Sequence, residues 1–145
     1  MVSRSLTLSG GGTVNVGTTT LTIAAPSTIT VTNGGNINGT GIVQLGAGPC
    51  DINTVGIGQF HIFPSLQGTA AINKTGPSQL WLRGANTYTG VTTINDGLLF
   101  AFNDLALGAT NGDTLVNGTA ELILYGTHVT NEVLTLNSTS SNGAL

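Results

Sequence analysis

The stretch from Thr92 to Phe102 reads TTINDGLLFAF, and the stretch from Thr114 to Leu124 reads TLVNGTAELIL, so two related segments begin 22 residues apart. A one-residue gap brings the two into alignment. A third segment, TVNVGTTTLTI from Thr13 to Ile23, aligns with residues 114–124 without a gap. A period of about 22 residues lies in the range of solenoid repeats, and predicts about six or seven stacked coils for a chain of this length.

Short runs of alternating apolar and polar residues fill the chain on both sides of these segments. A period of two residues is the pattern of half-buried strands. Clusters rich in Gly, Asn, Asp and Pro separate the runs and predict sharp turns. We therefore predict an all-β fold, a parallel β-helix (β-solenoid) of very short strands. The apolar pairs expected to point inward are Leu6/Leu8, Val14/Val16, Leu21/Ile23, Ile29/Val31, Val43/Leu45, Phe60/Ile62, Leu80/Leu82, Leu98/Phe100, Leu122/Leu124 and Leu134/Leu136.

The composition of the 145 residues agrees with this fold and excludes several functions. Charged residues make up 6% of the chain, and the sequence contains 22 Gly. Three Lys and Arg residues at a net charge of −3 provide no basic face for nucleic acid and no polybasic segment for anionic lipid. No apolar run has the length of a membrane span, so we expect no membrane insertion. Few charges also avoid like-charge repulsion between stacked coils.

Residues 68–99 resemble the passenger-associated repeat of bacterial autotransporters. The matching positions are Lys74, Gly76, Leu80, Leu82, Gly84, Asn86, Tyr88, Gly90, Thr92, Ile94 and Gly97. This resemblance implies a right-handed parallel β-helix that is extracellular or exposed on a bacterial surface. It transfers no catalytic residues, because the repeat occurs as a spacer in passengers with many roles. The chain lacks the apolar segment of a secretory signal. We expect residues 1–145 to be a single segment of a longer passenger, with an irregular insertion around residues 49–67.

Residues that could carry catalysis or bind a metal are few. The six acids show no paired-carboxylate motif, and two of them, Asp96 and Asp113, lie in turns that an Asp side chain caps by itself. His61 and His128 lack ligand-spaced neighbours. Cys50 is expected to be a small buried apolar residue. We therefore predict no enzyme activity, no metal and no cofactor.

A candidate binding patch comes from the strand around Trp81. Leu80 and Leu82 are expected to point inward, so Trp81 should point outward, with Leu99 at the same outward parity one coil later. Tyr88 lies nearby in the sequence. An exposed patch of Trp81, Tyr88 and Leu99 would bind a sugar or a protein partner. The alternative is that the segment 49–67 covers Trp81.

Two further expectations concern partners. A short solenoid exposes unpaired strand edges, which predicts a homo-oligomer formed by end-to-end or edge stacking. The function that we expect is a structural stalk or adhesin segment with a glycan or surface partner. The alternative is a carbohydrate-binding or carbohydrate-active β-helix that uses the Trp81 face. A third possibility, an ice or surface binder, needs a flat Thr array recurring at coil spacing, which the sequence does not show.

Overall fold

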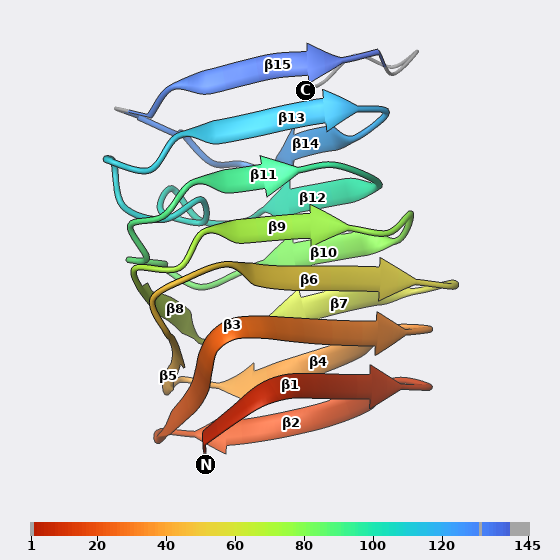
Figure 1. Cartoon of the computed structure of the whole chain (residues 1–145), viewed down its shortest axis with the longest axis vertical. Coiled ribbons are helices and arrows are strands. Elements are labelled where there is room, and N and C mark those ends of the chain that lie inside the picture. Colours follow the sequence, from red (N-terminus) through yellow and green to blue (C-terminus); the bar gives the residue numbers. More distant parts are fainter. Residues whose placement is uncertain (1, 131, 140–145) are drawn as a thin grey trace.

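The computed structural model describes residues 2–130 and 132–139, and within them the chain forms strands and turns without any α-helix. The strands wind into a stack of coils that rises from β1 to β15 (Figure 1). The elements are β1 (Val2–Ser9), β2 (Gly12–Gly17), β3 (Thr20–Thr32), β4 (Gly35–Gly39), β5 (Ile42–Leu45), β6 (Cys50–Val55), β7 (Gln59–Ile62), β8 (Ser65–Gly68), β9 (Ile72–Thr75), β10 (Gln79–Leu82), β11 (Thr92–Ile94), β12 (Leu98–Ala101), β13 (Thr114–Gly118), β14 (Glu121–Leu124) and β15 (Leu134–Ser138).

Parallel strands form the sides of the coil. Sheet A runs along the front of Figure 1 through β1, the second half of β3, β6, β9, β11, β13 and β15. Sheet B runs behind it through β2, β4, β7, β10, β12 and β14. The first half of β3 turns onto a third, shorter side, where it pairs with β5, which in turn pairs with β8. The six strands of sheet B correspond to about six coils, which confirms the predicted solenoid.

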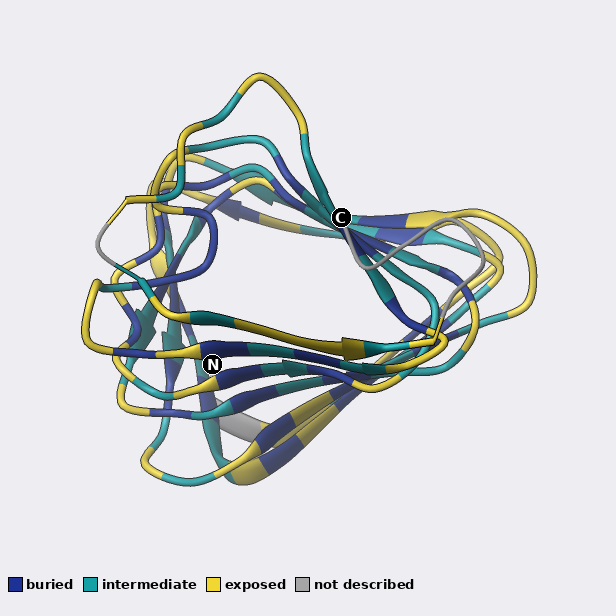
Figure 2. Cartoon of the chain, turned by 90° about the horizontal axis from the view of Figure 1, so that it is seen from above, coloured by how far each residue is buried: buried dark blue, intermediate teal, exposed yellow. Residues whose placement is uncertain are grey.

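The coil is right-handed. In Figure 1 the front strands run from left to right and the rear strands run from right to left as the chain climbs. A view along the axis shows the coils superposed around one interior, with buried and less buried residues alternating along the strands (Figure 2). The all-β, right-handed parallel β-helix expected from the sequence is therefore confirmed.

The interior is built from residues that occupy the same position on successive strands. Ile52 of β6, Lys74 of β9 and Ile94 of β11 are partners in register, and all three are buried. Val116 of β13 continues this row. Each fully buried aliphatic side chain contributes about 1.5–3 kcal/mol by leaving water. Since each coil is thin, it reaches this burial only by stacking on its neighbours.

One inward pair was assigned to the wrong parity. On β12 the inward residues are Leu99 and Ala101, both fully buried, whereas Leu98 and Phe100 are only partly buried. Register explains the difference, because Leu99 lies beside Leu80 and Phe100 lies beside Trp81. The preceding corner sets this parity through Gly97, which has a φ of 69°. A Cβ at Gly97 would lie 2.6 Å from the carbonyl oxygens of Gly76 and Ser78, so the corner requires glycine.

Two further expectations about the organisation of the chain are wrong. Residues 49–67 are not irregular, because they contain β6, β7 and most of β8, which pair in register with their neighbours. The segment from Thr13 to Ile23 starts in β2 of sheet B, whereas its supposed copies start in β11 and β13 of sheet A. Both errors have one cause: the alternation and the corner residues look alike on every side of the coil.

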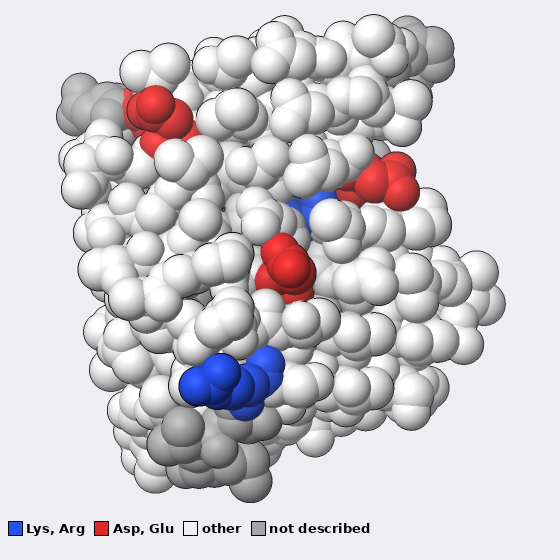
Figure 3. Space-filling view, viewed as in Figure 1, with Lys and Arg blue, Asp and Glu red and all other residues white. Residues whose placement is uncertain are grey.

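The outer surface carries few charges. Figure 3 shows the face over sheet A as almost entirely uncharged, with isolated basic and acidic side chains. Among the residues that the structure describes, no helix is long and apolar enough to cross a membrane.

Candidate functional site

Sheet B brings six rings together on its outer face. His61, Trp81 and Phe100 occupy one row, because Trp81 is in register with His61 on β7 and with Phe100 on β12. A second row is formed by the residues that directly follow the strands, Phe63 after β7, Phe102 after β12 and Tyr125 after β14, whose backbone N–H groups continue the bonding between coils. We call these six rings the aromatic ladder: His61, Phe63, Trp81, Phe100, Phe102 and Tyr125.

The rings of the aromatic ladder contact one another across the coils. The Trp81 ring centroid lies 4.7 Å from that of His61, 4.8 Å from that of Phe100 and 4.8 Å from that of Phe102. The Phe102 centroid lies 4.9 Å from that of Tyr125. Such pairs contribute about 0.5–1.5 kcal/mol each beyond their burial. The coil spacing therefore builds a continuous aromatic surface on a rigid sheet.

Arg83 lies among these rings. Its guanidinium carbon is 4.3 Å from the centroid of Phe102, 5.1 Å from that of Trp81 and 5.2 Å from that of Phe63. These distances are those of cation–π contacts. The Nε of Arg83 also donates to Nδ1 of His61 over 3.1 Å. The arginine side chain is therefore held against the ladder from both the ring faces and the imidazole.

The hydrogen bonds of His61 define its tautomer. Nδ1 accepts from Arg83, so the proton of the neutral ring is on Nε2, which lies 3.0 Å from Oε1 of Gln59 and donates to it. Burial, and then the positive charge of Arg83, lower the pKa of His61. Both effects favour the neutral imidazole that this network requires.

A polar groove adjoins the aromatic ladder. Its volume is about 470 Å³, and the residues that line it include Gly34, Gly35, Gly58, Asn36, Gln59, His61 and Gln79. Gln79 also accepts a hydrogen bond of 2.8 Å at Oε1 from Nε1 of Trp81. The groove and the ladder are therefore joined through Gln79 and His61. Together they offer ring faces, amide groups and one cation.

Of the three residues of the predicted patch, Trp81, Tyr88 and Leu99, only Trp81 lies on the outer face of the coil. Residues 49–67 do not lie over Trp81, because β7 lies beside β10 in the same sheet. Tyr88 and Leu99 are both 0% exposed, so the expectation that they form the patch is wrong. The sequence did contain a usable signal: Phe100 and Phe102 flank the small Ala101, as His61 and Phe63 flank Ile62.

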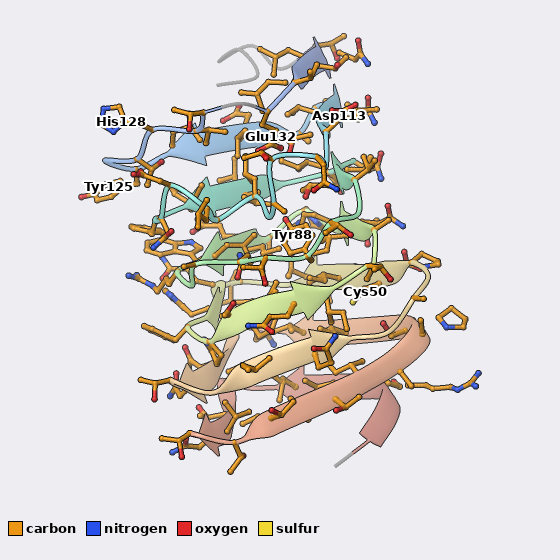
Figure 4. All side chains as sticks on the ribbon, turned by 90° about the vertical axis from the view of Figure 1, so that its left-hand side faces the viewer. Cys50, Tyr88, Asp113, Tyr125, His128 and Glu132 are labelled. Carbon is orange, nitrogen blue, oxygen red and sulfur yellow. The ribbon has the colours of Figure 1, made fainter. Side chains whose placement is uncertain are left out.

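Tyr88 takes part in an interior hydrogen bond instead. Its hydroxyl lies 2.7 Å from Oγ1 of Thr92. Burial raises the pKa of Tyr88 above its usual value. The hydrogen bond with Thr92 lowers this pKa, and the charge of Glu132 raises it. Figure 4 shows Tyr88 and Glu132 towards the body of the stack, whereas Tyr125 and His128 project from one margin.

Glu132 accepts a hydrogen bond from Oγ1 of Thr114, which is itself buried. Burial raises the pKa of Glu132, the Thr114 hydroxyl lowers it, and the charge of Asp113 raises it. The carboxylate of Asp104 accepts a hydrogen bond of 2.8 Å from the backbone N–H of His128, which lies 24 residues later in the sequence. Within residues 2–130 and 132–139 no three metal-ligating side chains gather at one place.

Lys74 and Cys50 are both buried. The Nζ of Lys74 donates to the carbonyl oxygens of Thr75, Gly76 and Asp96 over 3.0, 2.6 and 3.0 Å. Burial lowers the pKa of Lys74 to about 8, although the Asp96 carboxylate opposes this change. Burial raises the pKa of the Cys50 thiol, against the hydrogen bond with Ser27, and this favours the protonated thiol. Neither side chain is placed to meet a ligand at the surface.

The fold and the site define the chain as a right-handed parallel β-solenoid with an aromatic face. Residues 72–99 match the family model described as the passenger-associated-transport-repeat. The resemblance of residues 68–99 to an autotransporter passenger repeat is thereby confirmed.

The chain is also similar to the adhesin BmaC autotransporter of Brucella suis biovar 1 (strain 1330). The two are 35% identical over 101 residues, which is 67% of this chain and 3% of the adhesin. The chain thus spans a small part of the length of this relative. No solved structure matches the chain.

Proposed function

We propose that this chain is a non-enzymatic structural segment of an exported, surface-exposed passenger of the adhesin type. The observation that carries the proposal is the use of the repeat residues: they build the coil rather than a reactive site. Support also comes from the similarity to an autotransporter adhesin and to the passenger repeat.

Asn86 illustrates this use. Its Oδ1 accepts from the backbone N–H of Leu66 over 2.8 Å, and its Nδ2 donates to the carbonyl oxygen of Ala106 over 2.6 Å. The buried Asn86 side chain therefore connects three successive coils, on the side of the solenoid that contains β8. On this side of the coil β8 pairs with β5, and among the described residues no further strand follows β8, so the asparagine side chain bonds to backbone groups that a next strand would otherwise pair.

The repeat glycines serve the same purpose. A Cβ at Gly84 would lie 2.4 Å from the carbonyl oxygen of Pro64, and a Cβ at Gly90 would lie 2.1 Å from that of Ala70. Only glycine permits such close stacking of one coil on the next. A segment whose repeat residues stabilise the stacking of coils is suited to extending a passenger away from the cell.

Surface exposure is the direct test. Antibodies raised against the 145-residue chain are applied to intact and to permeabilised cells that make the full-length protein, and intact cells are also treated with an external protease. We expect labelling of intact cells that the protease removes. Labelling only after permeabilisation would contradict the proposal. A periplasmic protein labelled in parallel serves as the control for cell integrity.

A further inference from the structure

We propose that the aromatic ladder and the groove beside it bind a glycan that carries a carboxylate, with Trp81 as the stacking surface and Arg83 as the partner of the carboxylate. This inference goes beyond the structural role proposed above. Glycan binding is tested with the purified chain in solution, and surface exposure is tested on cells. Either proposal can therefore fail without the other.

The first argument is that the rings of the ladder are partly exposed and fixed in position. Trp81, Phe100 and Phe102 are partly exposed, and Phe63 and Tyr125 are 43% and 64% exposed. They lie on the parallel strands of sheet B or directly after them, and neighbouring rings contact one another. A fixed aromatic surface gives a large contact at low entropic cost, and the apolar face of a pyranose ring fits such a surface.

The second argument is the charge of Arg83. Its contacts within the described part of the chain are ring faces and Nδ1 of His61, and no described carboxylate forms an ion pair with it. The contact with His61 uses Nε alone, so the Nη groups remain as donors. A guanidinium fork matches a carboxylate, and stacking on the rings reduces the ordering that binding requires. Charge complementarity therefore favours an acidic sugar over a neutral one.

The third argument is the adjoining groove. Gln59 and Gln79 use their Oε1 atoms for His61 and Trp81, so their Nε2 amides remain as donors towards a ligand. Both residues line the groove, together with Asn36. Amide groups next to an aromatic surface provide the directional contacts that sugar hydroxyl groups need. The groove thus extends the site beyond a single sugar ring.

One acid adjoins the ladder: Asp104 follows Phe102 by two residues, and its carboxylate accepts a hydrogen bond from the backbone N–H of His128. Glu121 is in register with Leu98, which in turn is in register with Gln79, so two strand spacings separate Glu121 from β10, the strand that Arg83 directly follows. Asp51 is on β6 of sheet A. No described acid occupies the strands β7 or β10 that form the centre of the ladder.

The test uses the one tryptophan of the chain as the reporter. The fluorescence of Trp81 is titrated with tri-galacturonic acid and with 3′-sialyllactose, and then with the neutral counterparts galactotriose and lactose. We expect saturable quenching or a spectral shift with at least one acidic probe, and binding weaker by about tenfold or more for its neutral counterpart. The two acidic probes distinguish a uronic acid from a sialic acid.

Variants locate the site. Arg83→Gln removes the charge and should weaken binding of the acidic probe by about tenfold or more. Arg4→Gln, which removes an exposed arginine from β1 of sheet A, is the matched control and should leave binding unchanged. Trp81→Ala removes the fluorescent reporter, so its binding is measured by calorimetry and its fold is checked by circular dichroism. We expect this variant not to bind.

Three results would overturn the proposal. The first is the absence of any Trp81 response to both acidic probes up to millimolar concentration. The second is equal affinity for an acidic sugar and its neutral counterpart, which would indicate a neutral glycan. The third is equal binding by the Arg83→Gln and Arg4→Gln variants, since Arg83 would then not be the partner of the carboxylate.

Discussion

The ammonium nitrogen of Lys74 lies 2.6 Å from the carbonyl oxygen of Gly76, in a side chain that is 0% exposed. Lys74 occupies a row of the core that is otherwise aliphatic, between Ile52 and Ile94. Its long side chain packs there while its head group reaches the carbonyl oxygens of the corner between sheets A and B. The lysine of the passenger repeat is therefore a structural donor inside the coil.

The stability of the chain should depend on pH through Lys74. Folding lowers the pKa of Lys74 from 10.5 to about 8, so the folded state binds fewer protons than the unfolded state between these values. Stability rises with pH wherever the unfolded state holds more protons, so the contribution of Lys74 increases from about pH 8 to about pH 10. Urea unfolding at pH 7.5 and pH 9.5 measures this change.

The matched control for the pH experiment is Lys74→Met, which keeps a long apolar side chain and removes the titrating group. Cys50 and Tyr88 have raised pKa values and act in the opposite direction at high pH, but they are present in both proteins. We expect the wild-type chain to gain stability relative to Lys74→Met on going from pH 7.5 to pH 9.5. An unchanged difference between the two proteins would show that Lys74 does not titrate as described.

Removal of one hydroxyl group distinguishes the two tyrosines. Tyr88→Phe loses the interior hydrogen bond with Thr92, so we expect a loss of about 1 kcal/mol in the free energy of unfolding. Tyr125→Phe is the control, because Tyr125 is 64% exposed and should change stability by less than about 0.5 kcal/mol. Chemical denaturation of the three proteins makes the comparison. Equal effects of the two substitutions would contradict the buried position of Tyr88.

A methyl group at a stacking glycine should be costly. In Gly90→Ala the new Cβ would lie 2.1 Å from the carbonyl oxygen of Ala70, so the coils must separate locally. We expect a loss of more than about 2 kcal/mol, in the range of overpacked cores. Gly10→Ala is the control: its φ of +58° is strained for alanine, but no atom lies within 4 Å of the new Cβ. Its cost should be about 1–2 kcal/mol.

The ranking of the two glycine variants is measured by thermal unfolding followed with circular dichroism. If Gly90→Ala is as stable as Gly10→Ala, the coils are less tightly stacked at this corner than the structure shows.

Self-association through the edge strand β15 remains a prediction. Among the described residues β15 pairs on one side only, with β13, and Leu136 is 44% exposed. An exposed apolar side chain on the last described strand of the stack favours contact with a second copy. We expect the sedimentation coefficient of the 145-residue chain to rise with concentration, and Leu136→Lys to reduce the rise.

Thr30→Lys is the control for this experiment, because it adds the same charge in β3, where the strand is paired on both sides. A concentration-independent monomer for the unmodified chain would count against assembly through this edge.

Local pattern determined the fold class of this chain. The alternation in Leu80, Trp81 and Leu82 decided which side chain points outward, because successive residues of a strand face opposite sides whatever surrounds them. The spacing of 22 residues between Thr92 and Thr114 decided the coil, since a residue must meet its counterpart one turn later. The corner glycines completed the pattern, because few other residues adopt their conformations.

The tertiary structure decided which side chains meet. Phe100 joins Trp81 on the outer face, and Leu99 joins Leu80 in the core, because the corner at Gly97 sets the parity of β12. The sequence pattern around residues 98–102 is apolar at every position and therefore leaves both parities open. Tyr88 is buried for a similar reason: it lies outside any strand, where alternation gives no information. The aromatic ladder and the placement of Arg83 are products of register between coils, which no single segment of the sequence contains.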